Sequence, residues 1–147
     1  MANKRFFAGI LVMALVFGIT FIACDNGSTD NTDSALNGTW VSSYSVEIKL
    51  DKGNYEASRS GSLMSKGTYT TKDGKITITL THVWGKAYDN SLESKWYSKA
   101  DLKAALGIPD AQLDSMFTSQ TETYSVSGNK LTIGSGNDQD TYTKKQQ

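Results

Sequence analysis

From Leu36 onward, hydrophobic and polar residues alternate with a period of two, and this pattern constrains the fold more than any other feature of the chain. Such alternation is typical of β-strands with one buried and one wet face. In the first run, the apolar members share one parity: Trp40, Tyr44, Val46, Ile48 and Leu50. The clearest strand is Lys75–Trp84, and we expect it to place one set of side chains inward: Ile76, Ile78, Leu80, His82 and Trp84. The alternate residues, Thr77 to Val83, are then expected on the outer face.

Turn signals separate the strand patterns at short intervals. The strongest is the hairpin dipeptide Asp73-Gly74. The others are Asp51–Asn54, Ser60–Ser62, Gly128-Asn129 and Gly134–Asp138. Seven or eight short antiparallel strands joined in this way predict a mainly β domain over residues 36–147, built as a small up-and-down barrel. An eight-stranded barrel encloses room for its own side chains or for one small ligand.

A helical insertion over residues 98–117 interrupts the strands. Ser98 and Asp101 have the spacing of a capping box at the start of a short helix, and Gly107 is typical of a helix end. Pro109 then predicts the start of a second short helix. We expect the apolar residues of both helices to face the barrel.

Residues 97–109 are similar to the helix-turn-helix of bacterial regulators. That resemblance implies a second helix that enters the major groove and meets phosphates. The chain carries no Lys or Arg from Ile108 to Phe117, however, and phosphate contacts need cations. We therefore expect two amphipathic helices packed on the barrel rim, and no nucleic-acid partner.

The first 24 residues predict where the domain is located. Lys4 and Arg5 precede an uncharged apolar run, residues 6–23, which ends at Cys24. This segment resembles a bacterial lipoprotein signal peptide with its lipobox. The resemblance implies cleavage after residue 23, lipidation of Cys24, and attachment to a membrane of the bacterial cell envelope on its extracytoplasmic side. An uncleaved anchor helix and a soluble secreted form are the alternatives.

Residues 24–35 follow as the lipidated cysteine and a polar segment without hydrophobic periodicity, which we expect to be a flexible tether. The full chain has 15 basic and 15 acidic residues, and loss of Lys4 and Arg5 with the signal leaves a formal charge near −2. That balance does not favour binding to nucleic acid.

Residue types that support catalysis are scarce. Cys24 is the only cysteine and His82 the only histidine, so neither an intrachain disulfide, a thiol nucleophile nor a zinc site is expected. His82 has three possible roles: a hydrogen-bonded barrel residue, a polar group at the mouth of a pocket, or a general base. The carboxylates are scattered, without a paired site. We expect no enzyme activity, no cofactor and no metal.

Gly38-Thr39-Trp40, on the first expected strand, resembles the Gly-x-Trp signature of lipocalins. The resemblance implies a lipocalin-like barrel in which Trp40 is a structural plug at the closed end. In lipocalins an arginine of the last strand covers this tryptophan, and the last strand here offers Lys144.

Aromatic residues gather at the end of the clearest strand and in the segment that follows it. Together with His82 they form our candidate ligand site: Trp84, Tyr88, Trp96 and Tyr97. Aromatic side chains with polar tips line ligand sites and interaction surfaces, and they also form small cores under helices. The first hypothesis is a non-catalytic module that binds a small apolar or amphipathic ligand. The alternative is a solid-core envelope protein that uses its rim to bind or inhibit another protein, which requires Trp96 or Tyr97 to be exposed.

Overall fold

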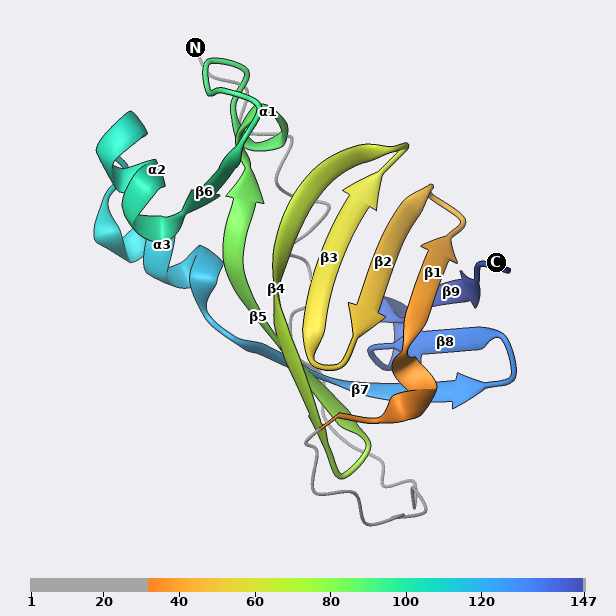
Figure 1. The fold of residues 1–147 in the computed structure, drawn as a ribbon. Helices are drawn as coiled ribbons and strands as arrows, with labels where there is room; N and C mark the ends of the chain where they lie inside the picture. Colours follow the sequence, from red (N-terminus) through yellow and green to blue (C-terminus); the bar gives the residue numbers. More distant parts are fainter. Residues whose placement is uncertain (1–31, 147) are drawn as a thin grey trace.

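The structure is a computed structural model that describes residues 32–146. The signal segment 1–23, Cys24 and most of the expected tether lie outside the described residues. Eight strands within 32–146 form a closed antiparallel barrel (Figure 1). They are β1 (Gly38–Ser42), β2 (Val46–Asp51), β3 (Asn54–Arg59), β4 (Ser62–Lys72), β5 (Lys75–Trp84), β7 (Gln120–Ser127), β8 (Lys130–Ile133) and β9 (Asp140–Lys144).

Each barrel strand pairs with the next one along the chain, and β9 pairs with β1 to close the ring. The predicted mainly β, up-and-down barrel is therefore confirmed. Asp73 and Gly74 both have positive φ, 51° and 70°, and they connect β4 to β5 as the dipeptide predicted. Two consecutive positive φ angles match the twist of the flanking strands in a two-residue hairpin.

The barrel interior is filled by a hydrophobic core. Trp40 and Tyr69 are its largest fully buried side chains. The remaining buried members are Leu36, Ile48, Leu50, Ala57, Ile76, Leu131 and Ile133. Burial of this apolar surface stabilises the domain, at roughly 1.5–3 kcal/mol for each large aliphatic or aromatic side chain.

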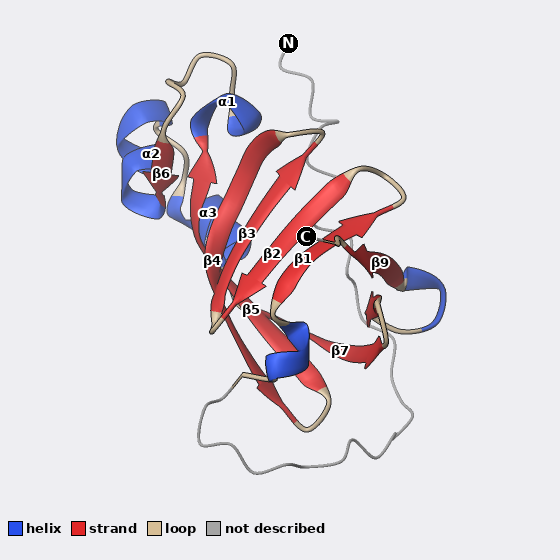
Figure 2. Cartoon of the chain, turned by 45° about the vertical axis from the view of Figure 1, so that its right-hand side comes forward, coloured by secondary structure: helices blue, strands red, loops and turns tan. Residues whose placement is uncertain are grey.

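A short 3₁₀ helix, η1 (Ser34–Leu36), lies at the base of the barrel (Figures 1 and 2). Leu36 is fully buried, and its carbonyl oxygen accepts a 2.7 Å hydrogen bond from the indole Nε1 of Trp40. Lys144 of β9 lies on the other side, with Nζ 5.1 Å from the Trp40 ring centroid. Trp40, the expected plug, is thus enclosed between the entering chain and the last strand.

A β-bulge divides β5 into two halves. Gly67 pairs with Leu80 and Lys66 pairs with His82, so no residue of β4 lies opposite Thr81 in the register. A bulge of one residue reverses which side chains face inward. Paired residues share a face, so Val83, opposite the buried Ser65, points inward.

The expectation that Ile76 to Trp84 share one face is therefore wrong beyond Leu80. His82 and Trp84 turn to the outer face, and Val83, expected outside, is 6% exposed. Gly67 is required at this point because a Cβ there would lie 2.0 Å from the carbonyl oxygen of Thr79.

The far half of β5 has a different neighbour from the near half. β7 pairs with β5 only over Lys75 to Ile78, and a ninth strand, β6 (Trp96–Ser98), pairs with His82 to Trp84. β6 was not predicted. It is connected to β5 by the short helix α1 (Gly85–Tyr88) and a loop.

Two further helices complete the insertion: α2 (Lys99–Leu106) and α3 (Asp110–Phe117). The capping box of Ser98 and Asp101 is present, and Gly107 ends α2 in the left-handed conformation with φ 64°, as predicted. These helices form a second hydrophobic core with β5 and β6. Its buried members are Val83, Leu92, Tyr97, Leu102 and Leu113. The insertion lies at the end of the barrel opposite η1 (Figures 1 and 2).

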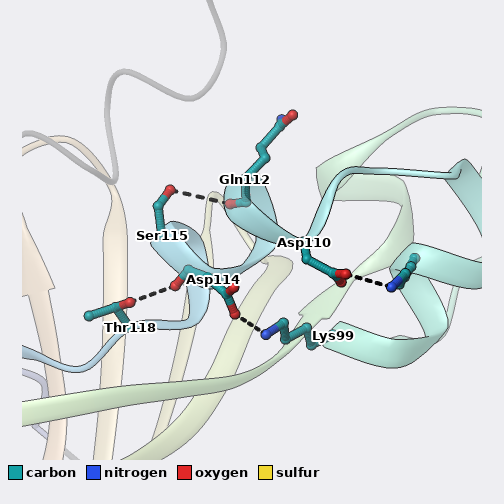
Figure 3. A network of polar contacts seen from close by, with 7 residues as sticks. Lys99, Asp110, Gln112, Asp114, Ser115 and Thr118 are labelled. Carbon is teal, nitrogen blue, oxygen red and sulfur yellow. Dashed lines mark hydrogen bonds and ion pairs between the residues drawn. The ribbon is translucent and has the colours of Figure 1, made fainter.

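Ion pairs connect the two helices on their exposed side (Figure 3). Lys99 pairs with Asp114, and Lys103 Nζ lies 2.7 Å from Asp110 Oδ2. Exposed pairs of this kind stabilise a protein little, so the second core supplies most of the attachment. No helix in residues 32–146 is long and apolar enough to cross a membrane.

Candidate functional site

The expected site residues divide between two faces of the β5–β6 ribbon. Trp84 and Trp96 are cross-strand partners on the outer face, with ring centroids 5.1 Å apart and an interplanar angle of 76°. Neither belongs to either hydrophobic core. Lys66 of β4 places Nζ 4.8 Å from the Trp96 ring centroid. We call Trp84 and Trp96 the outer aromatic pair.

Tyr97 and Tyr88 lie on the inner side with the second core. Tyr97 is 6% exposed, and its hydroxyl accepts a 3.3 Å hydrogen bond from the backbone N–H of Glu93. Tyr88 packs against the same core, and burial, followed by the nearby Asp89 carboxylate, raises its pKa. Both tyrosines therefore contribute to the packing of the second core.

His82 lies on the outer face, between Lys66 of β4 and Ser98 of β6. Its Nδ1 is 2.9 Å from the Thr81 hydroxyl oxygen, and Nε2 has no hydrogen-bond partner among the described residues. This position is compatible with two of the three roles considered for His82, a hydrogen-bonded barrel residue and a polar group beside a pocket. Within residues 32–146, no three His, Cys, Asp or Glu side chains lie close enough to hold a metal ion.

One open groove, which we call the rim groove, has a volume of about 470 Å³ and lies between the α1–β6 loop and α2. Its lining residues are Ser91, Leu92, Glu93, Lys95, Trp96, Tyr97, Asp101, Ala104 and Ala105. The charges lie at its border: Glu93 Oε2 is 2.8 Å from Lys95 Nζ, and this contact lowers the pKa of Glu93. Hydrogen bonds from Ser98 lower the pKa of Asp101.

A second groove of about 390 Å³, which we call the sheet groove, crosses β2 to β5. Its lining residues are Lys49, Asp51, Asn54, Tyr55, Glu56, Lys66, Gly67, Thr68, Thr81 and His82. Apart from His82, this set was missed from the sequence. The residues come from four strands, and they become neighbours only through a strand register that alternation alone does not determine.

The chain matches no known protein-family model and no curated protein sequence. It is similar to two solved structures. One is an uncharacterized protein from Bacteroides eggerthii DSM 20697, with 21% identity over 75% of this chain and 99% of that chain, and a TM-score of 0.44. The other is a lipocalin-like protein from Bacteroides uniformis ATCC 8492, with 20% identity over 76% of this chain and 99% of that chain, and a TM-score of 0.44. Similarity at this level transfers no function to the chain.

Proposed function

We propose that this protein is a non-catalytic binding module of the bacterial cell envelope, anchored through lipid on Cys24, that holds a small amphipathic ligand in the rim groove. The observation that carries the proposal is that side chains fill the barrel interior, whereas an open groove lies at the rim. The barrel interior is occupied by buried side chains such as Trp40 and Tyr69, whereas Trp96 and Tyr97 line an open groove. The ligand site is therefore outside the barrel, at its rim.

The lining of the rim groove suits a ligand with one apolar and one polar side. Leu92, Trp96 and the two alanines of α2 supply the apolar wall, while Glu93 and Lys95 at the border supply charge. A volume of about 470 Å³ lies within the range of roughly 300–1,000 Å³ that is usual for small-molecule sites. The carboxylate of Glu93 and the ammonium of Lys95 could bind a positively or a negatively charged group of the ligand.

The test uses the full chain and the amphipathic fluorescent probe 1-anilinonaphthalene-8-sulfonate. We expect saturable binding, which Ala105→Trp weakens at least about tenfold because the new indole fills the groove. Ala111→Trp is the matched control, since Ala111 is an exposed alanine of α3 outside the groove. Equal probe binding by the wild type and Ala105→Trp, or no saturable binding at all, would contradict the proposal.

Protein binding at the rim is the second candidate function, and the outer aromatic pair favours it. Two tryptophans outside both cores are typical anchors of protein interfaces. Tyr97 is too buried to join such a surface, so this reading depends on Trp96. A photo-crosslinking amino acid at position 96 should then give one discrete adduct in intact envelopes, and a diffuse ladder would count against it.

A further inference from the structure

A row of polar side chains crosses the outer face of the barrel perpendicular to the strands. Lys49 of β2 is opposite Glu56 of β3, and Glu56 is opposite Lys66 of β4. Lys66 is opposite His82 of β5. We call these four residues the polar row. They share one face because directly paired residues of antiparallel strands point to the same side.

The polar row exists because of the bulge at Thr81. In a β5 without the bulge, Thr81 would be opposite Lys66, and His82 would point inward with Ile78 and Leu80. The same reversal brings Trp84 to the outer face, next to the end of the row. One irregularity in β5 thus creates both the polar row and the aromatic surface beside it.

The functional groups of the polar row are largely unused. Within residues 32–146, the side chains of Lys49 and Glu56 make no ion pair or hydrogen bond, although they are cross-strand neighbours. Among the described residues, the one interaction of the Lys66 ammonium is with the Trp96 ring, and Nε2 of His82 has no hydrogen-bond partner. The row therefore offers hydrogen-bond donors and acceptors in alternation to a ligand.

The chemistry of the sheet groove excludes several ligand classes. Its two lysines are balanced by Asp51 and Glu56, so the groove does not select strongly for an anion or a cation. The strands beneath it pair on both sides, so an extended peptide cannot add to them as a further strand. The charged groups of Lys49, Glu56 and Lys66 also stand among its lining residues, and an acyl chain laid in the groove would have to exclude water from them without hydrogen-bonding to them.

From this geometry we propose that the sheet groove binds a neutral oligosaccharide, with successive sugar rings over successive strands and a C–H face against the outer aromatic pair. Sugar hydroxyls both donate and accept, which matches the alternation of ammonium, carboxylate and imidazole groups along the row. Neighbouring strands are about 4.8 Å apart, close to the length of one pyranose ring. This site shares Trp96 with the rim groove, but its hydrogen-bonding groups belong to the polar row, which lies outside that groove.

The proposal is tested by calorimetry on the full chain with soluble hexasaccharides of glucose and of N-acetylglucosamine. We expect saturable binding of at least one, little affected by salt because the ligand is neutral. Glu56→Gln and Lys66→Met should each raise the Kd about tenfold, since each removes one charge-assisted hydrogen bond. Lys72→Met is the matched control, on the same strand but outside the groove.

The outcomes separate this site from the rim groove. Hexasaccharide binding that persists in Ala105→Trp while probe binding is lost supports two independent sites. No saturable binding of either hexasaccharide, or binding that neither Glu56→Gln nor Lys66→Met weakens, overturns the proposal. Binding of hexagalacturonate alone, abolished by salt, also overturns it, because the site would then select an anion. Glu56→Gln nearly preserves the shape of the side chain, so the test does not depend on the folding of Lys66→Met.

Discussion

Several tyrosines of the barrel combine a buried ring with a hydroxyl at the edge of the core. Tyr55 shares a 2.7 Å hydrogen bond with Ser65, and Tyr124 donates a 2.9 Å hydrogen bond to Asp33. Burial is the main cause that raises the pKa of Tyr142 to about 12, with smaller contributions from Asp140 and Tyr55. The folded chain therefore keeps these hydroxyls neutral in alkaline solution.

This gives a prediction for stability at high pH. An unfolded tyrosine loses its proton near about pH 10, whereas Tyr142 in the folded chain keeps it to about pH 12. Between these values the unfolded state binds fewer protons, so the contribution of Tyr142 is complete below pH 10 and is lost as the pH rises to 12. We expect the free energy of unfolding, measured in urea, to fall less steeply in this window for Tyr142→Phe than for the wild type. Tyr44→Phe is the control because Tyr44 is 77% exposed. Parallel curves for Tyr142→Phe and the wild type would show that the assigned cause is wrong.

Strand β5 contributes side chains to both hydrophobic cores and to the outer face of the barrel. Its near half contributes Ile76 and Ile78 to the barrel core, and its far half contributes Val83 to the second core. The bulge at Thr81 makes this division possible, because it allows Val83 to meet the helices while His82 and Trp84 face outward.

Mutation can test this register. We expect Val83→Ala to lower the free energy of unfolding by about 2 kcal/mol, because it removes buried methyl groups from the second core. Thr81→Ala, at the exposed bulge residue, should cost less than about 1 kcal/mol. Chemical denaturation of both variants measures the difference. A larger cost at Thr81 than at Val83 would mean that β5 runs without the bulge.

The strands and helices were largely predictable from the sequence, and the site was not. Alternation, the Asp73-Gly74 turn and the capping box of Ser98 are local signals, and the structure confirms the elements that they predict. The bulge at Thr81 leaves no such signal, because Val83 and Trp84 are both apolar and either suits an inner face. β6 is only three residues long, Trp96–Ser98, too short for a period of two to be recognised.

The two ends of the barrel are built from different elements. η1 lies at one end of the barrel, and α1 and α2 lie at the opposite end (Figures 1 and 2). Trp40 is hydrogen-bonded to η1, and the rim groove adjoins α2. Asp33, one of the last residues of the expected tether, is held at the base. Its carboxylate accepts hydrogen bonds from the N–H of Ala35 and the hydroxyl of Tyr124, both 2.9 Å long.

Under the proposed lipid anchor on Cys24, this attachment predicts how the protein is oriented at the membrane. Only nine peptide units separate Cys24 from Asp33, which span at most about 30 Å. In vesicles that contain spin-labelled lipid headgroups, a fluorophore on Asp73→Cys at the base should be quenched more than one on Ser91→Cys at the rim groove. Equal quenching at both positions, or stronger quenching at position 91, would contradict this orientation.

The attachment of Asp33 at the base also affects the route by which a ligand reaches the rim groove. Under the proposed anchor, the short connection to Asp33 favours orientations in which the base of the barrel, and not the rim, faces the bilayer. A ligand of the rim groove would then reach it by diffusion from the aqueous side. The lipids of the anchoring leaflet would compete poorly with that ligand for the groove.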